Sequence, residues 1–274
     1  MAPVRRRGWA GMTRKERRSL WLGLLFVSPW LVQFLTMNLY PFVASFYYSL
    51  TQYSIIAQPV WIGLTNYQTL LTDDPNFWNS LGNTVYFTVL SVGLGTLLAI
   101  GMAMLLNMKV RMVSLYRTIF YLPSITPVVA SSIVWIFLFN PQYGLIDITL
   151  EFFNLPAIGW LSDPSWSKAS LVIMSLWGLG GAVIIYLAGL QDVPRELIEA
   201  ASLDGAGKAR QFWHITLPAI SPVILFNLIT GLIGAFQYFT QAFVMTNGGP
   251  ADSTLFYSLQ IYRQAFQDTV GKPT

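Results

Sequence analysis

The stretch that decides the fold is residues 199–222, EAASLDGAGKARQFWHITLPAISP, a long polar run between two strongly apolar segments. Residues 193–203 predict a helix, because proline is tolerated in a first turn and good helix formers follow it. The Asp204-Gly205 pair then ends this helix, since glycine readily adopts the left-handed conformation. Residues 206–218 predict a second helix. The stretch is therefore expected to form two amphipathic helices joined by a sharp turn, lying outside a lipid bilayer.

The composition places the rest of the chain in a membrane. Hydrophobic residues make up 54% of the 274 residues and charged residues only 10%, and the mean hydropathy is +0.52. A soluble domain carries about 25% charged residues, so an all-α, polytopic helical membrane protein is expected. The chain contains no cysteine, which excludes disulfides, thiolate metal sites and thiol nucleophiles.

Five apolar runs are long enough to cross a bilayer as helices. They lie at about 20–40, 84–106, 113–139, 170–190 and 219–245. The first run follows a basic tail, residues 1–19, and lacks a small-residue cleavage site, so it predicts an uncleaved helix and not a signal peptide. The predicted membrane domain spans 20–266 with a cytoplasmic loop at 191–218, external segments at 53–80 and 140–168, and a polar tail at 267–274.

The distribution of basic residues predicts the orientation. With a cytoplasmic N-terminus, 13 of the 16 Lys and Arg residues lie on cytoplasmic segments, and only Lys168, Arg263 and Lys272 lie outside. This pattern satisfies the positive-inside rule and places the 191–218 loop in the cytoplasm. A basic tail can also bind nucleic acid, but anchoring on the cytoplasmic side of a membrane is the commoner use, so no nucleic-acid partner is predicted.

Small residues recur at four-residue spacing in the apolar runs. Gly95, Ala99 and Ala103 share one face of the second run. Small side chains let helix backbones approach closely in lipid, so this face is expected to pack against another helix.

The polar stretch carries a recognisable pattern. Glu-Ala-Ala-x-x-Asp-Gly-Ala is followed by Phe212, Ile215, Leu217-Pro218 and Pro222. This pattern resembles the EAA loop of the permease subunits of ABC-type importers, in which the first helix of the loop is a coupling helix that docks in a cleft of a cytoplasmic ATPase. By this resemblance, the coupling contact involves Glu199, Ala200, Ala201, Asp204, Gly205 and Ala206.

The same resemblance implies partners and a location. They are a cytoplasmic ABC ATPase dimer that holds the ATP and Mg²⁺, a second homologous permease subunit and an extracytoplasmic solute-binding protein, at the plasma (inner) membrane of a bacterium or archaeon. The residues suit a protein contact, because small side chains allow close backbone approach and Glu199 offers a carboxylate to a basic group. The alternative is an ordinary amphipathic helix lying on the membrane surface.

Three further segments look like the sugar-importing branch of this family, with its maltose-type and glycerol-phosphate-type permeases. They are WIGLTNYQTLL (61–71), DPNFWNSLGNTVYFT (74–88) and TNGGPADSTLFYSLQIYRQAF (246–266). In that branch a Gly-Gly-Pro external turn leads toward a last helix. No apolar run of spanning length follows Phe266, so we expect five spans where the family core usually has six, with the last helix missing.

The fifth apolar run carries a polar stripe. Its members recur at spacings of three and four residues, which places them on one face of a continuous helix: Asn227, Thr230, Gly234, Gln237 and Gln241. A lipid-facing amide is unfavourable, so the stripe is expected either to line a watery path or to bond neighbouring helices. The first alternative predicts a path for a neutral, polyhydroxylated solute, with Tyr238, Trp135 and Trp177 available to stack on sugar rings.

The energy source is expected to lie in another subunit. The membrane-embedded parts of the five runs contain no ionisable residue, Arg117 being counted with the cytoplasmic segments, and proton-driven transporters commonly carry an ionisable relay. Residues 205–208 are similar to a P-loop, but Ser202 and Ala209 occupy positions that require Gly and Ser or Thr. The chain itself is therefore predicted to bind no cofactor and to be no enzyme.

Other candidate chemistry is not supported by the pattern. His214 is the only histidine, which excludes a histidine-based metal cluster, and the external carboxylates are too scattered for paired acid–base catalysis. The predicted function is a permease subunit for a sugar or related polyol. Two alternatives stay open: the same machinery for another solute, such as a glycerol phosphodiester, polyamine or peptide, and a channel or non-transporting membrane scaffold.

Overall fold

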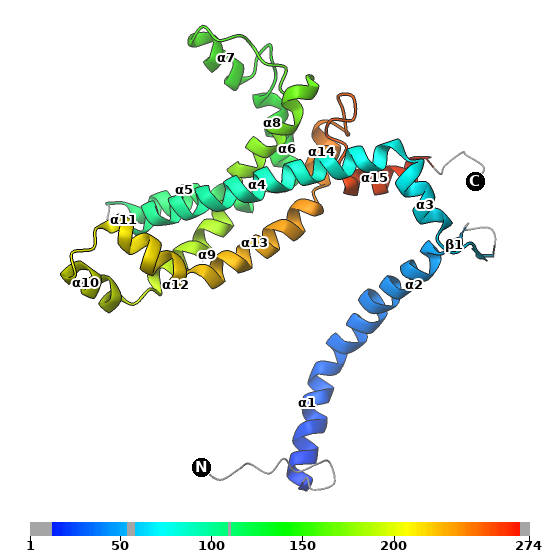
Figure 1. Cartoon of the computed structure of the whole chain (residues 1–274), viewed down its shortest axis with the longest axis horizontal. Coiled ribbons are helices and arrows are strands. Elements are labelled where there is room, and N and C mark those ends of the chain that lie inside the picture. The colour runs from blue at the N-terminus through cyan, green and yellow to red at the C-terminus, as the bar shows by residue number, and fades with distance from the viewer. Residues whose placement is uncertain (1–12, 54–57, 109–110, 269–274) are drawn as a thin grey trace. The chain divides into compact units, whose positions relative to one another are not determined.

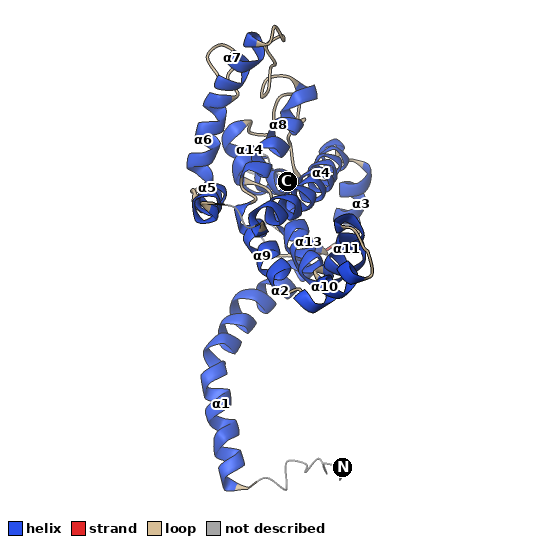
Figure 2. Cartoon of the chain, turned by 90° about the vertical axis from the view of Figure 1, so that its left-hand side faces the viewer, coloured by secondary structure: helices blue, strands red, loops and turns tan. Residues whose placement is uncertain are grey.

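The computed structural model describes residues 13–53, 58–108 and 111–268. The chain divides into two compact units, Met1–Asp74 and Pro75–Thr274, which are described separately. Helices dominate both units (Figures 1 and 2), and the only sheet among the described residues has two strands of two residues each. The predicted all-α class is confirmed.

The first unit is built on one long helix. Thr13 caps it: its hydroxyl accepts from the Glu16 N–H at 3.3 Å, and the Glu16 carboxylate accepts from the Thr13 N–H at 2.7 Å. The predicted first span, 20–40, lies inside this helix, which extends further at both ends. Its consecutive parts are α1 (Arg14–Gln33), the π-helical η2 (Phe34–Leu39) and α2 (Tyr40–Ser49).

A small hairpin and a short helix complete this unit. The Asn66 side-chain amide ties them together by donating to the backbone oxygens of Ser49 at 2.9 Å and Thr51 at 3.0 Å. The segment 53–80, predicted as a loop, therefore contains regular structure. It contains β2 (Val60–Trp61), which pairs antiparallel with the preceding β1 (Thr51–Gln52), and α3 (Thr65–Thr72).

The second unit is a helical bundle around α4 (Pro75–Asn107). Its remaining elements, in chain order, are α5 (Val113–Ile125), α6 (Val128–Leu138), α7 (Leu145–Phe152), α8 (Pro164–Trp177), α9 (Gly180–Gln191), α10 (Arg195–Leu203), α11 (Lys208–Gln211), the π-helical η3 (Phe212–Thr216), α12 (Leu217–Ala219), α13 (Ser221–Phe236), α14 (Thr240–Met245), α15 (Tyr257–Arg263) and the π-helical η4 (Gln264–Asp268). The second predicted span, 84–106, lies within α4, which begins nine residues earlier.

Two of the predicted spans are bent. α5 and α6 meet at 100°, and α8 and α9 meet at 49°, so each of the predicted spans 113–139 and 170–190 contains a bend between two helices. The first bend has a local cause, because Pro127 disfavours helical backbone at the residue before it, and Thr126 is extended at ψ 133.

A glycine begins the helix that follows the second bend. A Cβ added to Gly180 at the start of α9 would lie 2.4 Å from the Phe120 oxygen and 2.8 Å from the Tyr121 Cα of α5. Glycine is therefore required for this close crossing of the two helices.

Three helices among the described residues are long and apolar enough to cross a membrane singly, and five spans result if each bent pair counts as one. The three are Arg14–Ser49, Pro75–Asn107 and Ser221–Met245. The last of them is interrupted, because α13 ends at Phe236 and α14 begins at Thr240. Five spans is the number that the sequence predicts.

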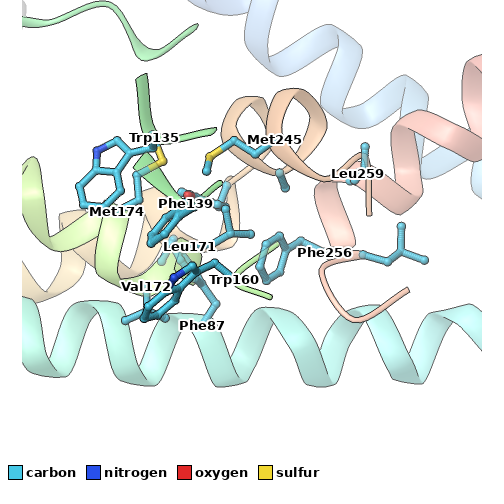
Figure 3. Packing of buried hydrophobic residues seen from close by; sticks show 14 residues of the cluster. Phe87, Trp135, Phe139, Trp160, Leu171, Val172, Met174, Met245, Phe256 and Leu259 are labelled. Carbon is cyan, nitrogen blue, oxygen red and sulfur yellow. The ribbon is translucent and has the colours of Figure 1, made fainter. Parts of the chain in front are cut away.

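The core of the second unit lies where α4, α6, α8, α14 and α15 meet (Figure 3). Phe87 of α4 packs against Phe256 with ring centroids 5.2 Å apart, and Trp135 packs against Phe139 at 4.9 Å. A second cluster joins α4 to α9, where Ala99 and Ala103 are completely buried. A Cβ added to Gly95 would lie 3.1 Å from the Leu179 side chain. The small-residue face of α4 therefore packs closely against its neighbours, as predicted.

The predicted Gly-Gly-Pro turn is a folded connection between α14 and α15. The Asn83 side-chain amide of α4 donates to the Asp252 oxygen at 2.9 Å and to the Leu255 oxygen at 3.2 Å. Arg263 of α15 pairs with the Asp252 carboxylate at 3.2 Å. These contacts fix the turn to α4 and α15, and the described residues beyond it contain only α15 and η4.

The segment 140–168, predicted to be external, contains α7 and the start of α8. The buried Asp147 carboxylate of α7 accepts from the Ile158 N–H at 3.0 Å and from the Trp160 indole N–H at 3.1 Å. This carboxylate therefore closes α7 and the following loop into a folded lobe. The lobe and the α10 region lie well apart in the second unit (Figures 1 and 2).

Candidate functional site

The polar stretch forms an elbow, defined here as residues 194–219, in which two short helical arms meet at a turn. The first arm, α10, ends in a Schellman motif: the Ala206 N–H donates to the Ala201 oxygen at 2.9 Å, and the Gly205 N–H donates to the Ser202 oxygen at 3.1 Å. Gly205 has φ +78, which confirms that this glycine forms the corner.

The second arm begins at Lys208 and continues through α11, η3 and α12. Gln211 holds it to the first arm, because its amide nitrogen donates both to the Ser202 hydroxyl at 2.9 Å and to the Ala206 oxygen at 2.8 Å. This double contact was missed from the sequence. The sequence shows only that Gln211 follows Ser202 by nine residues, with a glycine turn between them. That spacing is not specific enough to predict a hydrogen bond.

All six predicted coupling residues lie in this elbow. Glu199, Ala200 and Asp204 are exposed, whereas Ala201 and Ala206 are half-buried. The last two contact each other through the Schellman hydrogen bond, so they support the corner. A partner backbone can therefore approach closely at the exposed Ala200, but less readily at Ala201 and Ala206, which are half-buried.

The elbow joins two helices that line a common cavity. α9 precedes it, α13 follows it, and both pack against α4 (Figure 1). The cavity has a volume of about 210 Å³. Its lining residues, none of them charged, are Phe87, Ser91, Val92, Gly95, Thr96, Ser175, Leu179, Ala182, Tyr186, Asn227, Gly231, Gly234, Ala235 and Tyr238.

The cavity wall includes buried hydroxyl groups that have no hydrogen-bond partner among the described residues. Those of Ser91 of α4 and Tyr238 after α13 are among them. The Asn227 side-chain nitrogen donates to the Val223 oxygen at 2.9 Å, which leaves its oxygen as an acceptor. The cavity therefore offers neutral hydrogen-bonding groups on otherwise apolar walls, an arrangement typical of small-molecule sites.

The structure brings together only part of the predicted polar stripe. Asn227, Gly234 and Tyr238 line the cavity, but the Thr230 side chain is exposed and its hydroxyl donates to the Phe226 oxygen at 2.9 Å. The expectation of one continuous helical face is wrong, because α13 ends at Phe236 and the exposed Gln237 follows as its C-cap.

Gln241 belongs to α14 and lines a different cavity of about 260 Å³ between the α5–α6 bend and α8. Ser124, Ser131 and Trp177 share this second cavity. The interruption between α13 and α14 thus places the residues predicted to line a solute path in two separate cavities.

The aromatic residues differ in what they can offer a ligand. Tyr238 is packed between Phe87, at 4.1 Å between ring centroids, and Phe256, at 5.5 Å. Its ring is part of the core, and its hydroxyl is buried in the wall of the cavity. Trp135 is likewise buried, whereas Trp177 is 42% exposed and lines the second cavity, which leaves Trp177 as the tryptophan that a sugar ring can reach.

Comparisons with known proteins agree on one family. The family model described as "Binding-protein-dependent transport system inner membrane component" matches residues 91–270. The probable ABC transporter permease protein YesP of Bacillus subtilis (strain 168) is 38% identical over 93% of this chain and 83% of its own length. The lactose transport system permease protein LacF of Rhizobium radiobacter is 38% identical over 89% of this chain and 83% of its own length.

A solved structure shares the fold. It is a bacterial alginate ABC transporter in complex with an alginate pentasaccharide-bound periplasmic protein, which matches 92% of this chain and 86% of its own chain with a TM-score of 0.79 and 24% identity. Because the family model covers most of the bundle and the relatives match along most of their length, this chain belongs to the family of binding-protein-dependent transport system inner membrane components.

Proposed function

We propose that this chain is the membrane-spanning permease subunit of an ATP-driven importer for a sugar or a related polyol. The observation that carries the proposal is the connection of an exposed elbow to the two helices, α9 and α13, that wall an uncharged cavity. A force applied to the elbow from outside the bundle acts directly on the walls of that cavity. The names of relatives support a carbohydrate cargo: one is a lactose permease and another a permease for starch degradation products.

The cavity chemistry fits such a cargo. A polyhydroxylated solute both donates and accepts hydrogen bonds, and the free hydroxyls of Ser91 and Tyr238 with the Asn227 oxygen can serve both needs. A charged solute calls for an ionised partner in a site of low dielectric constant, because burying an unpaired charge is expensive. The lining residues include no such group.

ATP hydrolysis is assigned to a separate subunit. A cytoplasmic ATPase dimer holds ATP and Mg²⁺, and its closure moves α10, through Glu199, Ala200, Ala201, Asp204, Gly205 and Ala206. The movement passes to α9 and α13 and alternates the opening of the cavity between the two sides of the membrane. A second homologous permease subunit completes the membrane part, and an extracytoplasmic solute-binding protein delivers the cargo.

The proposed location is the plasma (inner) membrane of a bacterium or archaeon, with the N-terminus in the cytoplasm. The positions of the charges support this orientation. The elbow, with Lys208 and Arg210, lies at the Asn107 end of α4, whereas the Gly-Gly-Pro turn lies at the Pro75 end (Figure 1). Positive residues on the elbow side agree with a cytoplasmic elbow.

Glu199→Lys tests the coupling role. Glu199 is exposed and makes no ion pair among the described residues, so reversing its charge leaves the fold of the elbow intact. We expect uptake of radiolabelled disaccharides by reconstituted transporter to fall at least tenfold while membrane insertion is unchanged, because a buried, hydrogen-bonded charge pair at an interface is worth about 2–5 kcal/mol when broken.

Asp192→Lys is the matched control for charge, since Asp192 is also exposed but follows the end of α9 before the elbow begins. Its effect on uptake is expected to be smaller than that of Glu199→Lys. Normal uptake and normal substrate-stimulated ATP hydrolysis in the Glu199→Lys variant contradict the proposed coupling.

A further inference from the structure

One face of α10 presents two carboxylates followed by an exposed leucine at the end of the helix. Leu203, the last residue of α10, is 90% exposed, more than any other large hydrophobic side chain among the described residues. Glu196 and Glu199 precede it by seven and four residues, which places all three on one face of the helix. The opposite face is marked by Ile198 and Ala201, which are half-buried.

The leucine is held in a fixed position. The Schellman hydrogen bonds fix the backbone before and after Leu203, because they involve Ser202 on one side and Ala206 on the other. Gln211 then links both of these residues to the second arm. Binding therefore requires little ordering of the elbow, and such preorganisation raises the affinity of an exposed anchor.

We infer that Leu203 is the apolar anchor of the elbow and enters a pocket on the partner ATPase that is lined by apolar side chains and rimmed by Lys or Arg. This inference rests on the proposed function. An apolar side chain surrounded by polar residues has the layout of an interface hot spot, in which burial supplies the affinity and the polar rim excludes water. The negative carboxylates of Glu196 and Glu199 are complementary to positive Lys or Arg side chains at the rim of such a pocket.

The same charges argue against a membrane surface as the occupant. The cytoplasmic leaflet is negatively charged and attracts basic faces, yet the face that carries Leu203 is acidic. Two basic residues of the elbow, Lys208 and Arg210, lie on the second arm, and Arg195, at the first position of α10, is the basic residue of the first arm. Insertion of Leu203 into the leaflet would therefore bring Glu196 and Glu199 toward like charges.

Cysteine labelling tests the inference directly, because the chain contains no cysteine. In Leu203→Cys, the introduced thiol is the only one in the permease. In lipid nanodiscs, we expect a hydrophilic maleimide to label it rapidly, and saturating amounts of the purified cognate ATPase to slow labelling at least tenfold. Leu197→Cys is the control, since Leu197 is 51% exposed but lies off the acidic face; its labelling rate is expected to change less than twofold.

Affinity provides the second measurement. Leu203→Ala removes an exposed side chain and leaves the elbow hydrogen bonds in place, so the permease folds as before. We expect its affinity for the ATPase to fall on the order of tenfold, the loss expected when a leucine no longer buries its methyl groups. Leu197→Ala is expected to change the affinity less than twofold.

The outcomes separate this inference from the proposed function. Capture of no ATPase by the unaltered permease overturns both. ATPase capture with unchanged affinity for Leu203→Ala, or with unprotected Leu203→Cys, overturns the anchor alone. Slow labelling of Leu203→Cys before any ATPase is added shows a leucine inserted in the membrane and likewise overturns it.

Discussion

At the scale of single residues, Tyr238 belongs both to the aromatic core and to the wall of the cavity. Its ring packs against Phe87 and Phe256, while its hydroxyl is buried and has no partner among the described residues. A buried hydroxyl without a partner costs free energy. Under the proposed function, a polyhydroxylated solute in the cavity supplies the missing hydrogen bond, so the unsatisfied group is retained for binding.

Tyr238→Phe measures this role. The change removes only the hydroxyl, so the folded protein loses no internal hydrogen bond and its thermal stability is expected to be equal or higher. We expect the apparent KM for uptake to rise about three- to tenfold, since one hydrogen bond contributes about 0.5–1.5 kcal/mol. The measurement is the concentration dependence of initial uptake rates.

Thr230→Val is the matched control, because it also removes a hydroxyl from this region but at an exposed position outside the cavity. Its KM is expected to stay within twofold of the unaltered protein. An unchanged KM for Tyr238→Phe with increased stability would instead identify Tyr238 as a core residue without a role in binding.

At the scale of elements, the elbow acts as one body because Gln211 joins its two arms. Without this link, the chain at Gly205 and Ala206 still connects α10 to the second arm. A displacement of α10 would then be absorbed at the glycine corner before it reached α13. The double hydrogen bond of Gln211 is therefore expected to transmit movement from the first arm to the cavity wall.

Gln211→Ala removes both hydrogen bonds of the link. The local opening free energy of the turn is expected to fall by about 1 kcal/mol, which corresponds to roughly fivefold faster amide hydrogen exchange at residues 204–208. Uptake per ATP hydrolysed is expected to fall severalfold, while the ATPase still binds. Hydrogen-exchange mass spectrometry and coupled transport assays provide the measurements.

Gln191→Ala is the control for this change, since Gln191 is exposed and ends α9 just before the elbow. Neither its hydrogen exchange at residues 204–208 nor its transport stoichiometry should change. Exchange in Gln211→Ala that matches the unaltered protein would show that the two arms are held together by other contacts.

At the scale of the whole molecule, two regions of the bundle are separated along α4. The elbow lies near Asn107, and the turn fixed by Asn83, Asp252 and Arg263 lies near Pro75 (Figure 1). A transporter requires its coupling site and its solute entrance on opposite sides of the membrane. This separation suits the proposed orientation.

The orientation is testable with single cysteines in the cysteine-free chain. Ser165→Cys, on the exposed start of α8, is expected to react with an impermeant maleimide in intact cells. Lys208→Cys, on the elbow, is expected to react only after the cells are permeabilised. The two positions serve as controls for each other, and the reverse pattern of labelling contradicts a cytoplasmic elbow.

Much of this protein is readable from local sequence. The excess of apolar residues requires a membrane and hence helices, because backbone groups in lipid must be satisfied within the chain. The elbow is equally local: helix formers precede Gly205, and this glycine adopts positive φ where it was expected. The domain limits at 19, 20, 266 and 267 and the six coupling residues stay predictions.

Other features were decided only by tertiary contacts. Gly180 allows α9 to cross α5 closely, and the hydroxyls of Ser91 and Tyr238 meet at one cavity from helices far apart in the chain. The helix that carries the polar stripe ends at Phe236, and Tyr238, just beyond it, packs into the aromatic core formed by Phe87 and Phe256. Composition and spacing determine the class of protein and the positions of helices and turns, since these depend on neighbouring residues. Bends and cavities depend on which distant side chains meet, and the folded chain alone determines that.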